Sequence, residues 1–94
     1  MKVTDSVSSG RRLARMVDLE RALGLKKSAI HARIALGLCI KPVALGPRAA
    51  RYPSDEIAAL VDAHAAGLND CAIKALVKKL HEARVGVAAG LTGA

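Results

Sequence analysis

A glycine between two short amphipathic segments constrains the fold of this chain more than any other feature. Residues 17–23 and 26–36 both space their apolar side chains as along one face of a helix, and Gly24 lies between them. A glycine here can adopt the left-handed conformation that ends a helix and starts a tight turn, and Gly37 stops the second segment in the same way. The pattern predicts a helix-turn-helix. The apolar positions concerned are Leu19, Leu23, Ile30 and Ile34.

The middle of the chain changes from helical to extended patterning. Pro42 forbids a regular helix around it, and Gly46 followed by Pro47 is a turn signal. We therefore predict a small β-hairpin, or wing, with Arg48 near its tip and Arg51 on the returning strand. We further expect the cations of the second helix and of this hairpin to converge on one convex surface.

Two further helices are predicted in the second half of the chain. One begins with a Ser54 cap and two acidic residues in its first turn, and it ends at Gly67. The other begins at Asn69 or Asp70 and runs to about Arg84. Their apolar stripes are Ile57, Leu60, Val61 and His64 in the first, and Ala72, Ile73, Leu76, Val77 and Leu80 in the second.

The predicted organisation is one small, mainly α-helical domain, because 94 residues are too few for more. We expect a winged helix-turn-helix with two C-terminal helices over residues 13–84, entered by a short extended segment. A flexible basic arm, residues 1–12, precedes the domain, and a flexible tail, residues 85–94, follows it. With no Phe or Trp in the chain, the core must consist mainly of aliphatic side chains.

Positive charge is concentrated in the first half of the chain. Residues 1–51 carry 11 Lys and Arg against 3 Asp and Glu, a net charge of +8, whereas residues 52–94 carry 4 against 5, a net charge of −1. This asymmetry implies a polyanionic partner for the first half. Tyr52 is the only aromatic residue, so stacking of unpaired bases is disfavoured and a duplex is the favoured partner.

Residues that serve catalysis or metal binding do not group in the sequence. Cys39 and Cys71 are far apart, so neither a structural disulfide nor a metal site is expected. The stripe position of His64 predicts a core or interface residue, and His81 is expected at the surface. We predict no enzymatic activity, no cofactor and no small-molecule substrate. No apolar run reaches the length of a membrane span, and we expect a cytoplasmic, nucleoid-associated protein.

The second predicted helix presents a polar, basic face opposite its isoleucines. Lys27, Ser28 and His31 fall on this face, as a helix that contacts bases in the major groove requires. Ser28 lacks the Asp–His pair that nucleophilic catalysis needs to orient a base, and for His31 a half-buried packing role is the alternative. Arg11, Arg12 and Arg15 belong either to a phosphate-binding arm or to a solvated tail. The predicted DNA-binding residues are Arg15, Lys26, Lys27, Ser28, His31, Arg33, Arg48 and Arg51.

Several short stretches occur in an order and at a spacing typical of one family. They are Gly24-Leu25, Lys27-Ser28-Ala29-Ile30-His31, the run from Gly37 to Arg48, Tyr52 and Glu56-Ile57. Together they resemble the AlpA-type family of small prophage regulators, which share the MerR-like winged helix-turn-helix with phage excisionases. The resemblance covers about half of the chain, and residues 66–84 are similar to the C-terminal extension of some members.

The resemblance implies sequence-specific binding of duplex DNA, with the second helix in the major groove and the hairpin arginine on the backbone or in the minor groove. In this chain those roles would fall on Lys27, Ser28, His31 and Arg48. The chain departs from the family pattern at Lys26 (usually Ser or Thr), His31 (usually Tyr), Cys39-Ile40 (usually an aromatic residue and Pro) and Tyr52 (usually Trp).

We predict that the protein binds double-stranded DNA sequence-specifically, as a transcriptional regulator or as an excisionase-like architectural factor. The alternative is a regulator that binds an acidic partner protein without specific DNA binding; RNA binding is the other rival. One short recognition helix usually needs a second copy for useful affinity, as a homodimer or as an oligomer assembled on DNA. Whether the last helix supplies that contact or only closes the core stays open.

Overall fold

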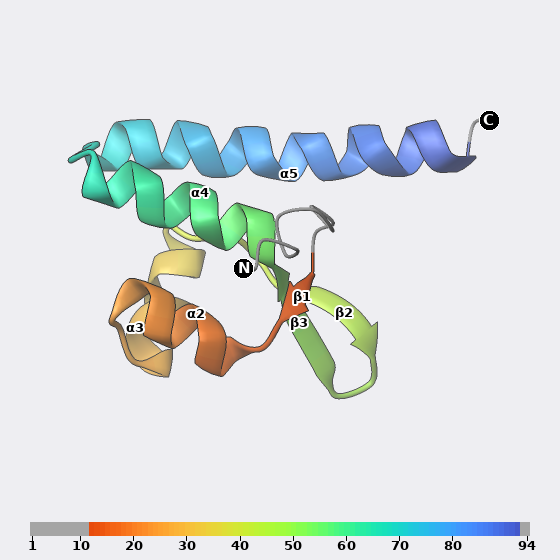
Figure 1. The fold of residues 1–94 in the computed structure, drawn as a ribbon, viewed down its shortest axis with the longest axis horizontal. Helices are drawn as coiled ribbons and strands as arrows, with labels where there is room; N and C mark the ends of the chain where they lie inside the picture. Colours follow the sequence, from red (N-terminus) through yellow and green to blue (C-terminus); the bar gives the residue numbers. More distant parts are fainter. Residues whose placement is uncertain (1–11, 93–94) are drawn as a thin grey trace, which may run out of the picture.

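Four helices and a three-stranded antiparallel sheet make up the part of the chain that the computed structural model describes, residues 12–92 (Figure 1). Side chains are described for residues 12–84. This is the mainly helical class that we predicted, and the arrangement is compatible with a winged helix-turn-helix. The elements are β1 (Leu13–Ala14), α2 (Met16–Leu23), α3 (Lys27–Ala35), β2 (Val43–Gly46), β3 (Ala49–Pro53), α4 (Ser54–Ala65) and α5 (Asp70–Thr92).

The helix pair α2 and α3 is confirmed, together with the glycine that separates the two helices. Gly24 has a φ of 67°, in the left-handed region, and its N–H donates to the Glu20 carbonyl at 2.8 Å. Gly37 follows α3 with a φ of 79°. Lys26 precedes α3 with no side-chain capping hydrogen bond, because an ammonium group has no acceptor to offer the first N–H groups of a helix.

The predicted hairpin is confirmed as β2 and β3. The short extended entry that we predicted contains a third strand, β1, whose pairing with β3 we did not predict. The strand order is β1-β3-β2, with Ala14 opposite Tyr52 and Val43 opposite Arg51. The register of β2 against β3 shifts between Ala44 and Gly46, and such an irregularity bends and twists a hairpin. Because β1 pairs with the returning strand, the chain that enters α2 is fixed to the base of the hairpin.

The start of α4 differs from the prediction. The capping position is Pro53, and the hydroxyl of Ser54 accepts the Arg12 N–H at 2.8 Å, which holds β1 against this helix. Glu56 lies in the first turn as predicted, and it is completely buried. His64, predicted in the core or an interface, is exposed, because Ala63 occupies the inward position of that turn.

The last helix, α5, begins as predicted and is longer than predicted. The side-chain oxygen of Asn69 accepts the Ala72 N–H at 2.9 Å, which caps the helix. The helix runs to Thr92 instead of ending near Arg84, so residues 85–92, which we had assigned to a flexible tail, are helical. Figure 1 shows α5 as a long rod that lies along α4 and extends past the N-terminal end of α4. None of the helices within residues 12–92 combines the length and apolarity needed to cross a bilayer.

A single core joins these elements, and it is aliphatic apart from Tyr52 and Cys39. α4 packs between α5 on one side and α2 on the other, so it is the middle of three helical layers (Figure 1). Tyr52 is buried with the aliphatic side chains, while Ile34 and Leu80 pack against the edge of the core. The buried apolar residues are Leu19, Ile30, Leu38, Cys39, Ile40, Tyr52, Ile57, Leu60, Ala63, Ile73 and Val77.

Candidate nucleic-acid interface

A basic groove lies between the N-terminal ends of α2 and α3 and the hairpin. It is a hollow of about 580 Å³. Five of the eight predicted DNA-binding residues line it, although they are separated along the chain. We expected a convex surface, and the structure instead gives a shallow concave one. The basic groove is lined by Arg15, Met16, Val17, Lys27, His31, Pro42, Arg48, Ala50, Arg51 and Tyr52.

The charge of this groove is one-sided. Four of its lining side chains, Arg15, Lys27, Arg48 and Arg51, are permanent cations, and none of its lining residues is acidic. Within residues 12–84 none of the four forms a salt bridge. Cations held together without counterions repel one another, so the groove favours an anion that bridges them.

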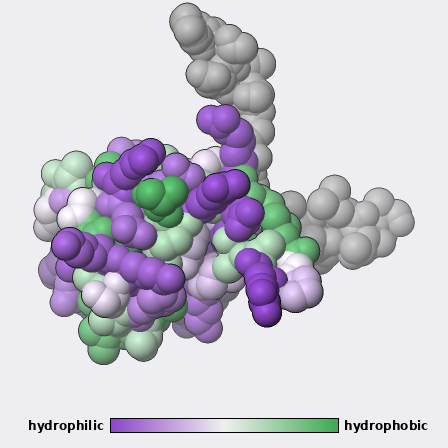
Figure 2. All heavy atoms as spheres, turned by 90° about the horizontal axis from the view of Figure 1, so that it is seen from below, coloured by the Kyte–Doolittle hydropathy of each residue, from purple (hydrophilic) through white to green (hydrophobic). Residues whose placement is uncertain are grey.

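The N-terminal half of α3 supplies the outward face of this site. Ile30 is completely buried and fixes the rotation of the helix, so that Lys27, Ser28 and His31 are exposed on the other side. His31 is therefore not the half-buried packing residue of the alternative interpretation. Figure 2 views the molecule from the side of α2, α3 and the hairpin, and long hydrophilic side chains cover much of this face around a smaller hydrophobic area.

The hairpin brings two arginines to the opposite wall. Arg48 lies in the turn between β2 and β3 and is exposed. Arg51 lies on β3, is half-buried, and its guanidinium donates to the Ala50 carbonyl at 2.9 Å. Arg48 thus lies at the tip of the hairpin, whereas Arg51 lies nearer its base, opposite Val43.

Three predicted residues lie outside the groove. Lys26 and Ser28 are exposed beside it. Arg33 is half-buried and lines a separate hollow of about 220 Å³ between α2, α3 and α4, together with Val61 and His64. Arg12 is described and exposed, and Arg11, with the rest of the predicted arm, lies outside the described residues.

A cluster of polar residues that we did not predict fixes the start of the hairpin. Glu56 on α4 accepts hydrogen bonds from the guanidinium of Arg84 on α5, including Nε to Oε2 at 2.9 Å. Arg84 also donates to the Lys41 carbonyl at 2.8 Å, and the Lys41 N–H donates to Nε2 of His81 at 3.1 Å. We call these four residues the Lys41 clamp. Both backbone groups of Lys41 are held, two residues before β2 begins.

The Lys41 clamp depends on the charge state of His81. Nε2 accepts a hydrogen bond only when it carries no proton. Partial burial lowers the pKa of His81, and the neighbouring Arg84 and Lys41 lower it further against an opposing effect of Glu56. The neutral form that the clamp needs is therefore the favoured one at neutral pH. His81, predicted at the surface, is half-buried.

The sequence carried one clue to the clamp. His81 and Arg84 follow Val77 by four and seven positions, so they continue the buried face of α5. An arginine on such a face requires a buried acid, but nothing in the sequence identifies Glu56 as that acid.

Two buried side chains of the described residues, Cys39 and Tyr52, have a raised pKa. Cys39 and Cys71 are both free thiols, and burial raises the pKa of Cys39, which makes it a poor nucleophile. Burial likewise raises the pKa of Tyr52. No group of three or more His, Cys, Asp or Glu residues that could hold a metal ion occurs among the described residues.

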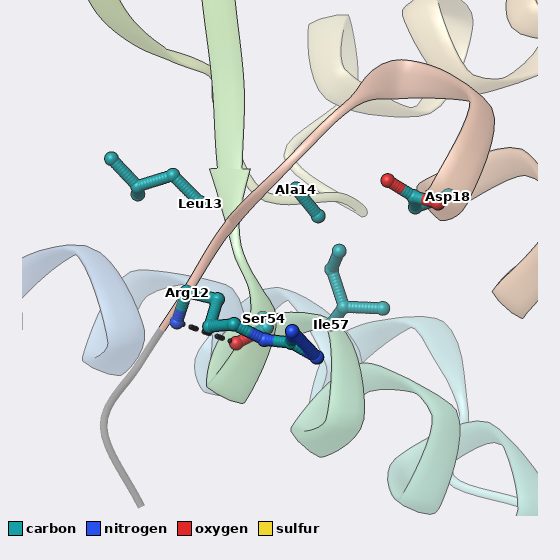
Figure 3. A pocket seen from close by; sticks show the side chains of 6 residues that line it. All are labelled: Arg12, Leu13, Ala14, Asp18, Ser54 and Ile57. Atoms are coloured by element: carbon teal, nitrogen blue, oxygen red, sulfur yellow. Dashed lines mark hydrogen bonds between the residues drawn. The ribbon is translucent and has the colours of Figure 1, made fainter. Parts of the chain in front are cut away.

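A second hollow, of about 440 Å³, lies where β1 meets α4 (Figure 3). Its polar groups are engaged in holding the fold. The Ser54 hydroxyl receives the Arg12 N–H, and Asp18 accepts the Arg15 N–H at 3.0 Å. It therefore offers no nucleophile with an adjacent base.

The chain was compared with protein-family models, with curated proteins and with solved structures, and none of them matches it.

Proposed function

We propose that the protein binds double-stranded DNA through the basic groove, as a regulator of transcription or as an architectural factor of the excisionase kind. The observation that carries the proposal is the meeting of Arg15, Lys27, Arg48 and Arg51 around the exposed face of α3, without an acidic residue among them. Such a set of cations suits a row of phosphates.

The dimensions of α3 support major-groove binding. A helix with its side chains is about 10–12 Å across and the major groove is about 12 Å wide, so the exposed N-terminal half of α3 can lie against base edges. Lys27, Ser28 and His31 would then contact bases. The arginine in the hairpin turn would contact the backbone or the adjacent minor groove.

This geometry also supports the resemblance to AlpA-type regulators and to the winged helix-turn-helix of excisionases. The positions that the resemblance assigns to DNA contact, Lys27, Ser28, His31 and Arg48, are all exposed, and three of the four line the basic groove. A single copy offers one short helix and one hairpin, so we propose that two or more copies bind together on one duplex.

The first test is fluorescence anisotropy with random-sequence duplexes at increasing salt. We expect a log–log slope of about −4 to −6 per protomer, corresponding to about four to seven neutralised phosphates. Unlabelled single-stranded DNA and duplex RNA should compete poorly. A flat salt response, or equal competition by RNA, would refute duplex DNA as the partner.

Specificity is tested by selecting preferred sequences from a random duplex pool with wild type, His31→Ala and Arg48→Ala. We expect His31→Ala to change the selected sequence and Arg48→Ala to weaken all sequences alike, because only the former residue lies on the face assigned to base contact. Selection of the same sequence by wild type and His31→Ala would remove His31 from base recognition.

A further inference from the structure

A second groove, on another face of the molecule, is apolar inside and basic at its edge. We call it the α5 groove. It is a hollow of about 430 Å³ between α5, the end of α3 and the loop that leads to the hairpin. Val77 and Cys39 are buried beneath it, and Ile34 is half-buried at its wall. The α5 groove is lined by Ile34, Gly37, Cys39, Lys41, Lys74, Val77, Lys78, His81 and Glu82.

Three lysines give this groove its charge. Lys41, Lys74 and Lys78 are exposed, and within residues 12–84 none of them forms a salt bridge. Their methylene chains extend the apolar walls, while the ammonium groups reach the rim. Glu82 is the single acid among the lining residues, so the net charge of the rim is positive.

The α5 groove and the basic groove share no lining residue. The loop between α3 and β2 separates them, with Lys41 lining one and Pro42 the other. A ligand in the α5 groove therefore does not use the residues that line the basic groove.

We propose that the α5 groove binds a short acidic, amphipathic segment of a partner protein. Its apolar side chains would pack against Ile34 and the lysine methylenes, and its carboxylates would meet the three ammonium groups, as when an amphipathic helix binds in a groove. The hollow is open along one side, so it suits a peptide helix that lies along it better than a small molecule, which needs enclosure. A second copy of this chain is disfavoured as the occupant, because it carries a net charge of +7.

The test is a selection with random peptides of about three helical turns (~12 residues), displayed on yeast and sorted with the labelled full-length protein. The basic groove also attracts acidic peptides, so peptides that still bind the Lys74→Glu/Lys78→Glu variant are removed in alternate rounds. We expect the surviving peptides to combine Asp or Glu with Leu, Ile or Phe at helical spacing.

Two neighbouring lysines on α5 provide a matched pair of variants. Lys78 lines the groove and Lys79 does not, although both are exposed and carry the same charge. For a synthetic copy of the selected peptide, Lys78→Glu should lower the affinity about tenfold or more, and Lys79→Glu by less than about twofold. Thermal unfolding followed by circular dichroism checks that both variants are folded.

Three results would overturn the proposal: no peptide survives the selection, the survivors lack acidic residues, or Lys78→Glu and Lys79→Glu weaken binding equally. The last result would show attraction by overall charge only. None of these results bears on duplex binding, because that is measured without the peptide.

Discussion

Two arginines, one beside the start of the hairpin and one in its turn, have opposite surroundings. Arg84, on α5, lies against a carboxylate that is completely buried, and its side chain is 21% exposed. Arg48, in the turn between β2 and β3, is exposed and has no salt bridge within residues 12–84. A cation with a fixed acidic partner stabilises the fold, whereas a cation without one is available to an outside anion. The two arginines therefore mark two parts of the molecule. Arg84 belongs to the contacts between α4, α5 and Lys41 that hold the start of the hairpin, and Arg48 belongs to the exposed turn that can contact a ligand.

The largest effect is expected when the carboxylate of the paired arginine is removed. Glu56→Ala leaves the Arg84 guanidinium partly buried without its counterion, which should lower the free energy of unfolding by about 3 kcal/mol. For a domain of this size, the melting temperature should fall by about 12 °C or more. Urea and thermal unfolding, followed by circular dichroism, measure both quantities.

The control for this prediction is Asp62→Ala, which removes an exposed carboxylate from the same helix. It should change the stability by less than about 0.5 kcal/mol. The double variant Glu56→Ala/Arg84→Met should be more stable than Glu56→Ala alone, since no buried charge is left unpaired. An equal loss in Asp62→Ala and Glu56→Ala would contradict the assignment.

Removing cations from the basic groove should weaken duplex binding and leave the stability of the fold unchanged. Lys27→Ala/Arg48→Ala should leave the stability within about 0.5 kcal/mol of wild type, since both residues are exposed and unpaired. Duplex affinity should fall about 100-fold at an ionic strength of about 0.15 M, where the Debye length is about 8 Å, and the salt slope should decrease by about two.

The matched control is Lys74→Ala/Lys79→Ala, which removes the same charge from α5, outside the basic groove. Its duplex affinity should change less than about threefold, because charges beyond a Debye length are largely screened. If the two double variants weaken duplex binding to the same extent, the net charge and not the basic groove determines the affinity.

Local patterns in the sequence predicted the positions of the helices and of the hairpin, but they did not predict contacts between residues that are far apart in the sequence. Gly24, Gly37 and Pro42 act on the backbone beside them, so the helix pair and the hairpin could be derived from single residues. The pairing of Glu56 with Arg84 spans 28 positions, and no local rule brings these two residues together. The same holds for β1, whose two residues become a strand only because β3 lies beside them.

The residues of the candidate site also fall into two groups: those that local patterns placed correctly, and those whose position depends on packing between distant elements. Helical periodicity alone placed Lys27, Ser28 and His31 on the exposed face of α3, because the buried position of Ile30 fixes its rotation. Periodicity did not show that Arg33 lies in a different hollow, since that depends on how α4 packs against α2 and α3. The contacts that fix Lys41 at the start of the hairpin could not be predicted either, because its backbone N–H and C=O make them and its side chain does not.

The smallest expected effect concerns the pH dependence of the Lys41 clamp. The folded-state pKa of His81 is lowered, so the folded protein binds fewer protons than the unfolded chain just below the ordinary value of about 6.5. Its contribution to stability is complete above that pH and is lost as the pH falls through the folded-state pKa. The loss should be about that of one hydrogen bond, below about 1 kcal/mol. Urea unfolding between about pH 8 and pH 5 measures it.

His81→Gln should reduce this pH dependence, because the amide oxygen can accept the Lys41 N–H at any pH. His64→Gln, on the exposed side of α4, should keep the dependence of wild type. His81 accepts the Lys41 N–H and lies near Arg84 and Glu56, and it lines the α5 groove together with Lys74, Lys78 and Glu82. The pH dependence of stability therefore has to be measured on the protein without peptide or DNA. An identical pH profile for wild type and His81→Gln would mean that the arginine half of the Lys41 clamp holds the hairpin alone.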